Sequence, residues 1–129
     1  MEYVLLIVGH DDAYRALDEE TGKAMYAGHI AFMDECKAAG VAIPYSAELR
    51  PPDTARTLNA DGTVTDGPFA ETKEQLGGFY VLDCADLDEA LRWAKKIPMR
   101  SGAIEVRPVM DLSGYGYRSR TVTPVNAAA

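Results

Sequence analysis

The chain has few of the residues that build metal centres and disulfide frameworks. It contains two cysteines and two histidines among 129 residues. Cys36 and Cys84 are too far apart for any closely spaced ligand motif, and each lies in an apolar segment that predicts a buried, reduced thiol. We therefore expect no metal site, because one histidine in an apolar interior is a poor ligand set.

Long hydrophobic runs and basic clusters are also missing. The apolar run at residues 4–8 is far shorter than the ~20 residues that a membrane span needs, and no basic leader precedes it. The net charge of -7 gives a surface that repels phosphate backbones and anionic lipids. The sequence thus predicts a cytoplasmic protein with neither nucleic acid nor membrane as a partner.

The common signatures of nucleotide and metal chemistry do not occur. The chain has no GxGxxG, P-loop, CxxC or HExxH motif, so no cofactor is expected. What it does have is an ordinary globular composition, with 47% hydrophobic and 26% charged residues, at a length that fits one domain.

The apolar pattern predicts an alternation of strands and helices. Two strands are apolar at both parities, two carry a proline that indicates a sheet edge, and two segments show a helical stripe. Asp61-Gly62 predicts an added β-hairpin, and the acidic stretch 11–20 a short solvated helix. In chain order the six main segments are residues 2–8, 21–39, 41–49, 78–82, 86–97 and 103–109.

This order, β-α-β-β-α-β with an added β-hairpin, predicts an α+β domain of ferredoxin-like fold with the first and third core strands in the middle. Two helices cover only one face of such a sheet. Because the two middle strands are apolar on both faces, we expect a homodimer that packs sheet face against sheet face.

One block of sequence supports a family resemblance. Residues 66–80, which begin Asp66-Gly67-Pro68-Phe69, together with residues 3–9, 85–98 and 104–108, resemble the DGPF-domain branch of the YCII-related proteins. The resemblance implies a dimeric α/β barrel, a single domain over residues 1–112 and a C-terminal tail over 113–129. Some family members are encoded beside, or fused to, extracytoplasmic-function sigma factors. Catalytic histidine and aspartate positions of the family would correspond to His29 and Asp66.

His29 is the leading catalytic candidate from the residues themselves. It falls four residues after Met25 and four before Met33, on an otherwise apolar helical face. An imidazole titrates near neutral pH and can act as general acid or base, but a core histidine bonded to a backbone carbonyl explains the pattern equally well. His10, just after the first strand, is expected to be an exposed turn residue.

Asp66 also allows two interpretations. It either forms the turn before Gly67, or it directs its carboxylate into a pocket beneath the hairpin. In the second case the Phe69 ring would form one wall of that pocket. Glu71 and Lys73 are candidates for the rim of a ligand-binding cleft, and Tyr80, in the buried strand that follows, completes the binding candidates.

Two functions follow from these residues. The first is a cofactor-independent acid/base enzyme of isomerase or lyase type on a small organic molecule, with His29 as acid/base and Asp66 orienting it. The alternative is a non-catalytic module that binds a small ligand or regulates, with a link to sigma-factor transcription control.

Overall fold

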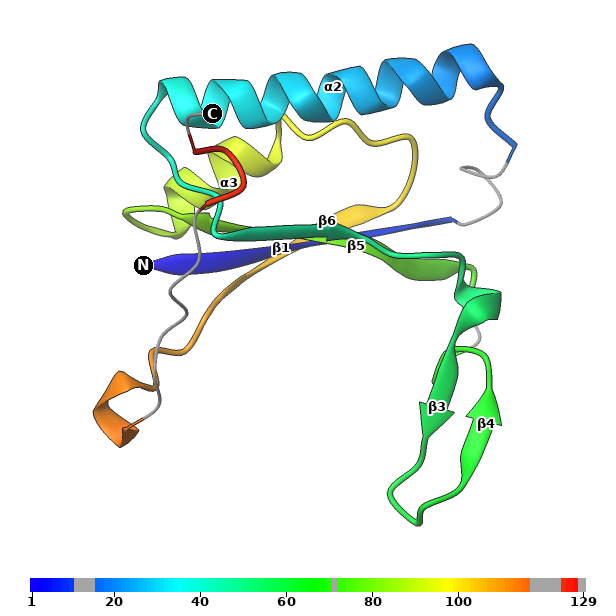
Figure 1. Ribbon diagram of the computed structural model, residues 1–129. Coiled ribbons are helices and arrows are strands. Elements are labelled where there is room, and N and C mark those ends of the chain that lie inside the picture. The colour runs from blue at the N-terminus through cyan, green and yellow to red at the C-terminus, as the bar shows by residue number, and fades with distance from the viewer. Residues whose placement is uncertain (11–15, 71, 117–123, 128–129) are drawn as a thin grey trace.

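The computed structural model describes residues 1–10, 16–70, 72–116 and 124–127. In this part of the chain a four-stranded sheet carries two α-helices on one face, and a β-hairpin projects away on the opposite side (Figure 1). The elements are β1 (Glu2–His10), α2 (Glu19–Ala38), β2 (Tyr45–Glu48), the 3-10 turn η1 (Pro52–Thr54), β3 (Arg56–Leu58), β4 (Val64–Asp66), β5 (Glu74–Asp83), α3 (Leu87–Ala94), β6 (Ala103–Pro108) and η2 (Ser113–Tyr115).

The sheet has the strand order β2-β5-β1-β6, with every neighbouring pair antiparallel. The two strands that are apolar at both parities, β1 and β5, are the central ones, as predicted. Pro44 stands directly before β2 and Pro108 ends β6, and both strands are edges, because proline has no N–H to give to a ladder. The architecture is an α+β fold of the ferredoxin-like kind.

Helix α2 begins two residues earlier than the apolar stripe predicts. Asp18 caps it by accepting a 2.6 Å hydrogen bond from the backbone N–H of Thr21. Of the predicted acidic helix, residues 11–15 lie outside the described part, and residues 16–18 are not helical but lead into this cap. Neither α2 nor α3, nor any other helix in the described ranges, is long and apolar enough to cross a membrane.

The core lies between the helices and the sheet. Leu5 and Leu82 from the central strands pack there with Phe32 and Cys36 of α2, all at most 2% exposed. Both cysteines are buried and unpaired, as expected. Burial raises the pKa of the Cys36 thiol to about 12 and that of Cys84 to about 11, so neither forms a reactive thiolate near neutral pH.

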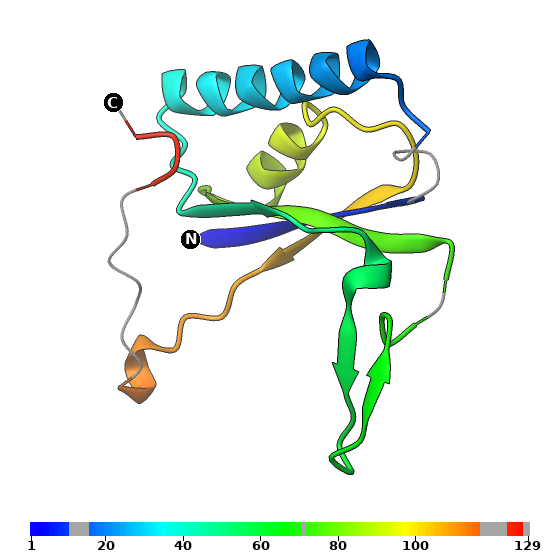
Figure 2. The same ribbon diagram turned by 45° about the vertical axis from the view of Figure 1, so that its right-hand side comes forward.

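Helix α3 closes only part of the helical layer. Asp86 caps it by accepting a 2.8 Å hydrogen bond from the backbone N–H of Glu89, as the sequence predicts. The helix packs against β6 and β1, and its Trp93 meets Phe32 edge-on at 6.2 Å between ring centroids. The half of the sheet at β2 and β5 therefore receives its cover from α2 (Figure 2).

The predicted hairpin is present as the pair β3–β4, in which Arg56 lies opposite Asp66. Asp66 is the last residue of β4, and Gly67 follows it with φ of 87°, a conformation that favours glycine. The backbone N–H of Gly67 donates to the carbonyl of Ala55 at 2.8 Å, which closes the base of the hairpin.

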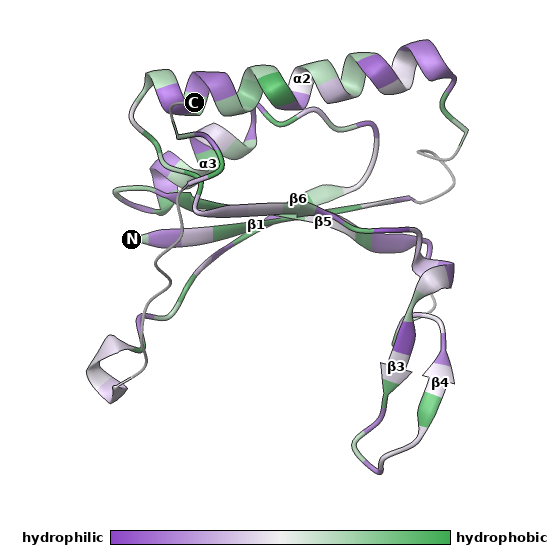
Figure 3. Ribbon diagram, in the orientation of Figure 1, coloured by the Kyte–Doolittle hydropathy of each residue, from purple (hydrophilic) through white to green (hydrophobic). Residues whose placement is uncertain are grey.

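The sheet face opposite the helices carries apolar side chains. Across the strands, Leu6 of β1 pairs with Phe79 of β5, and Tyr45 of β2 pairs with Val81 of β5. Tyr45 is 47% exposed and contacts Phe79 at 5.8 Å between ring centroids. The middle of the sheet is built from apolar residues (Figure 3).

Residues 124–127 of the C-terminal tail bind to their own chain. The backbone N–H of Val125 donates to the carbonyl of Ile43 at 2.8 Å. The Asn126 side chain accepts from Ile43 N–H at 2.9 Å and donates to the Val41 carbonyl at 2.7 Å. These bonds satisfy the backbone of the segment between α2 and β2.

Candidate active site

A pocket of about 750 Å³ lies between α2 and the sheet, beside strands β2 and β5. It forms there because α3 covers the other end of the sheet. Its size suits a small organic ligand. The residues that line it come from β1, α2 and the turn before it, β2 and the segment after it, and β5: Ile7, Gly9, Leu17, Asp18, Glu19, Gly22, Met25, Tyr26, His29, Met33, Ser46, Ala47, Glu48, Leu49, Arg50, Pro51, Pro52, Gln75, Leu76, Gly77, Gly78, Phe79 and Tyr80.

His29 is a polar residue on the α2 face that borders this pocket. Met25, His29 and Met33 all line it, which confirms that the four-residue spacing places them on one face. The His29 Nδ1 atom lies 2.7 Å from the hydroxyl oxygen of Tyr80 on β5. The two rings are nearly parallel, at 19°, with centroids 5.9 Å apart. His29 is therefore bonded to a side chain and not to a backbone carbonyl.

Burial sets the protonation states of this pair. It lowers the pKa of His29 below its ordinary value of 6.5, against a smaller upward effect of the Glu48 charge. Burial also raises the pKa of Tyr80 to about 12. Near neutral pH the imidazole is uncharged and the phenol keeps its proton.

A second polar pair lies in the same pocket. The Tyr26 hydroxyl donates to the Glu48 carboxylate, at 2.9 Å from Oε2 and 3.2 Å from Oε1. Tyr26 is three residues before His29 on α2, and Glu48 is the last residue of β2. The carboxylate raises the pKa of the Tyr26 hydroxyl.

Neither residue of this pair was a candidate from the sequence alone. Tyr26 had a usable signal, since residues three apart on a helix share a face and His29 was already a candidate. Glu48 had none, because its position depends on the register between β2 and β5, where it lies opposite Gly78.

Asp66 is not part of this pocket within one chain. Its carboxylate pairs with Arg56 Nε at 3.1 Å across the hairpin, and its side chain is 90% exposed. The hairpin projects from the sheet on the side away from α2 (Figure 1). A single chain therefore does not bring Asp66 to His29, whose ring is bonded to Tyr80.

Of the predicted binding residues, one lines the pocket and two lie away from it. Tyr80 is buried and lines the pocket. Phe69 is 89% exposed and Lys73 is exposed, and neither borders the pocket in the single chain. Glu71 lies outside the described residues.

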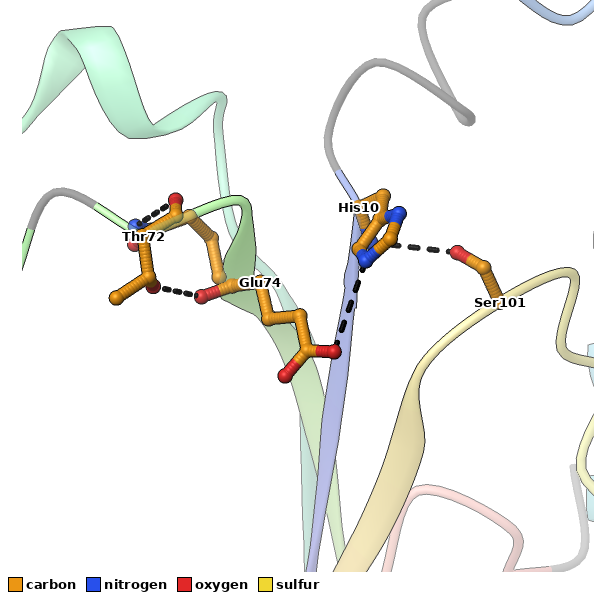
Figure 4. A network of polar contacts seen from close by, with 5 residues as sticks. His10, Thr72, Glu74 and Ser101 are labelled. Carbon is orange, nitrogen blue, oxygen red and sulfur yellow. Dashed lines mark hydrogen bonds and ion pairs between the residues drawn. The ribbon is translucent and has the colours of Figure 1, made fainter.

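His10 belongs to a separate cluster at the end of β1 (Figure 4). Its Nε2 atom lies 3.6 Å from the Glu74 carboxylate of β5, and its backbone N–H donates to Ser101 Oγ at 3.3 Å. The expectation of a turn residue is wrong, because β1 extends through His10 and pairs it with Glu74. Among the described residues, no group of three or more His, Cys, Asp or Glu side chains is arranged to hold a metal ion.

The fold and the pocket together define a ferredoxin-like α+β domain with a cavity between α2 and the sheet. A comparison with solved structures agrees on the fold. The dehydrochlorinase TftG of Burkholderia phenoliruptrix AC1100, which acts on 5-chloro-2-hydroxyhydroquinone, was solved in complex with 2,5-dihydroxybenzoquinone. It matches with a TM-score of 0.50 and 18% identity, over 85% of this chain and 94% of that one.

Sequence comparison gives the family. The YCII-related domain matches residues 1–113, so the chain belongs to the YCII-related family. Uncharacterized protein R00369 of Rhizobium meliloti (strain 1021) is 38% identical over 115 residues, which cover 84% of this chain and 92% of that protein.

Proposed function

We propose that the protein is an acid/base enzyme of isomerase or lyase type that acts on a small organic molecule without a cofactor, with His29 at its centre. The observation that carries this proposal is the 2.7 Å contact between His29 Nδ1 and the Tyr80 hydroxyl inside a pocket of ligand size. A buried partner that fixes the imidazole is what a catalytic histidine requires. In one chain Tyr80 has the orienting role, and Asp66 stays a candidate only for a site that a second copy completes.

The fold neighbour supports the choice of ligand size and type. TftG holds a dihydroxybenzoquinone, a single six-membered ring with oxygen substituents. The pocket here combines apolar walls, such as Met25 and Met33, with the polar groups of His29 and Glu48. Such a mixture suits a small oxygen-bearing ring compound.

We further propose a cytoplasmic homodimer of the DGPF branch, in which residues 1–112 form the domain and two open sheet faces pack together as an α/β barrel. The apolar pairs Leu6–Phe79 and Tyr45–Val81 on that face support this arrangement. Leu6→Glu should convert the dimer to a monomer in sedimentation experiments. The matched control is Leu58→Glu on the hairpin, where the leucine is already 72% exposed. A wild-type protein that sediments as a monomer would contradict the dimer.

The test of the enzyme begins with a thermal-shift screen of small oxygen-bearing ring compounds, because a ligand that binds the native state raises its apparent stability. Turnover of the hits is then followed by NMR. His29→Gln should abolish turnover while the protein stays folded, and His10→Gln, a change of the same type outside the pocket, should not. Turnover that survives in His29→Gln would refute the proposal.

The separation of His29 from Asp66 favours a second candidate, a module that binds a small ligand and regulates a partner such as a sigma factor. In that case the screen finds ligands that bind but are not converted. His29→Gln then changes their affinity alone.

A further inference from the structure

The hydrogen bond between His29 and Tyr80 has a preferred direction. A phenol is a stronger donor than a neutral imidazole N–H, and an imidazole nitrogen is a stronger acceptor than a phenol oxygen. Both groups are uncharged near neutral pH, since burial lowers the pKa of His29 and raises that of Tyr80. Tyr80 therefore donates its hydroxyl proton to Nδ1.

This direction fixes the tautomer of the ring. A neutral imidazole carries one proton, so a ring that accepts at Nδ1 carries its proton on Nε2. No described residue forms a hydrogen bond with Nε2, and the side chain lines the pocket. His29 thus offers a ligand an N–H donor at Nε2, and the lone pair on Nδ1 already accepts the hydrogen bond from Tyr80.

A proton acceptor is present in the same pocket. Glu48 lies opposite Gly78, and Ser46 lies opposite Tyr80, so Glu48 and Tyr80 are diagonal neighbours on the face that α2 covers. Gly78, opposite Glu48, adds no side chain to this face, and a Cβ there would lie 2.7 Å from the backbone oxygen of Ala47. Tyr26 has one hydroxyl proton and donates it to one carboxylate oxygen at a time, which leaves acceptor capacity on the other.

The charged residues that line the pocket disfavour the binding of a negatively charged ligand. Of the described lining residues, Asp18, Glu19 and Glu48 are acidic and Arg50 is basic. A ligand with a negative charge would meet net repulsion there, so an uncharged ligand is favoured.

From this geometry, and resting on the function proposed above, we propose that His29 acts as a neutral hydrogen-bond donor through Nε2, that Glu48 is the catalytic base, and that the substrate is an uncharged carbonyl compound. Glu48 removes a proton from the carbon next to the carbonyl. The C–H electron pair forms a C=C bond, and the carbonyl pair moves to the oxygen, which Nε2–H stabilises. In the isomerisation of a β,γ-unsaturated carbonyl compound the enolate is conjugated with the second C=C bond, and protonated Glu48 returns the proton to the γ-carbon, which leaves the α,β-unsaturated product.

The tautomer can be tested without any substrate. In a ¹⁵N-labelled protein, long-range proton–nitrogen correlation should show His29 Nδ1 as an unprotonated nitrogen and Nε2 as a protonated one. Assignment is direct, because the chain has two histidines and His10→Gln removes one set of signals. Tyr80→Phe should abolish this preference and leave a mixture of tautomers. A proton on Nδ1 in the wild type would overturn the donor role.

The base can be tested with cyclohexane-1,4-dione, an uncharged carbonyl probe, by following exchange of its α-protons with D₂O by NMR. The wild type should accelerate exchange, and Glu48→Gln should reduce the acceleration about 10²-fold or more. His29→Gln should reduce it about 10²- to 10³-fold. The matched control is Glu35→Gln on α2, whose carboxylate pairs with Lys96 outside the pocket; it should exchange at the wild-type rate.

The outcomes separate this inference from the function on which it rests. Exchange that Glu48→Gln leaves intact would overturn Glu48 as the base, and a wild type that does not accelerate exchange would overturn the carbonyl class. Either result, combined with turnover of another ligand that depends on His29, would leave the acid/base enzyme standing. Turnover that does not need His29 would instead refute the enzyme proposal itself.

Discussion

The two sides of the sheet differ in how they use polar residues. On the side of α2, His29, Tyr80, Tyr26 and Glu48 form two hydrogen-bonded pairs in a pocket. On the side of the hairpin, the DGPF segment presents an exposed ion pair of Asp66 with Arg56. The most distinctive stretch of sequence therefore lies away from the site that a single chain builds. A distinctive turn sequence is good support for a fold but does not by itself locate chemistry.

The two sides of the sheet should differ most in what the removal of a phenylalanine ring does to stability. Phe32 on α2 is 2% exposed and lies between Tyr80 and Trp93, with ring centroids 4.9 and 6.2 Å away. Phe32→Ala should lower the free energy of unfolding by about 3 to 5 kcal/mol, because it leaves a cavity beside the pocket. Phe69→Ala, at an 89% exposed ring, should change it by less than about 0.5 kcal/mol. Urea denaturation measures both.

A large loss of unfolding free energy in Phe69→Ala would show that the hairpin side is not free. It would mean that the hairpin side is packed against another copy, since among the described residues none covers this ring. Repeating the denaturation at several protein concentrations would distinguish that case from a local effect.

The sequence predicted the frame of the fold well, because local patterns encode it. Double-sided apolar strands identified β1 and β5 as central, and Pro44 and Pro108 marked the edges. His29 stood out as one polar residue in an apolar stripe. The site was harder to predict because the position of Glu48 depends on how β2 and β5 pair. The register that places Glu48 opposite Gly78 brings its carboxylate to the pocket. Likewise, the direction in which the hairpin leaves the sheet decides where Asp66 lies.

The next largest effect is expected when the hydroxyl of Tyr80 is removed. Tyr80→Phe removes the donor to His29 Nδ1 and should lower the free energy of unfolding by about 1 kcal/mol. Because that donor favours the neutral imidazole, its loss should raise the pKa of His29 toward the ordinary value. Titration of the His29 ring protons by NMR measures the shift. Tyr45→Phe on the open face is the matched control, and an equal pKa shift there would contradict a direct bond.

The pH dependence of stability gives a smaller effect from the same residue. The folded-state pKa of His29 lies below the value of 6.5 that it has when exposed, so the unfolded chain binds a proton first as the pH falls. His29 therefore contributes stability above about pH 6.5 that is lost as the pH falls toward its folded pKa. His29→Gln should flatten the loss of stability between about pH 7 and about pH 5, as followed by thermal unfolding. An unchanged slope in His29→Gln would contradict the assignment.

The smallest effect is expected for Asp66, and it tests the separation of the two sides most directly. Asp66→Asn breaks an exposed pair with Arg56, which should cost less than about 1 kcal/mol in urea denaturation. It should leave the pKa of His29 unchanged, because in one chain α2, which carries His29, and the hairpin, which ends at Asp66, lie on opposite sides of the sheet (Figure 1). A shift in the His29 titration would mean that the hairpin of a second copy brings its carboxylate to the pocket. The two sides would then form one site across the dimer, and the histidine–aspartate pair expected from the sequence would exist between chains.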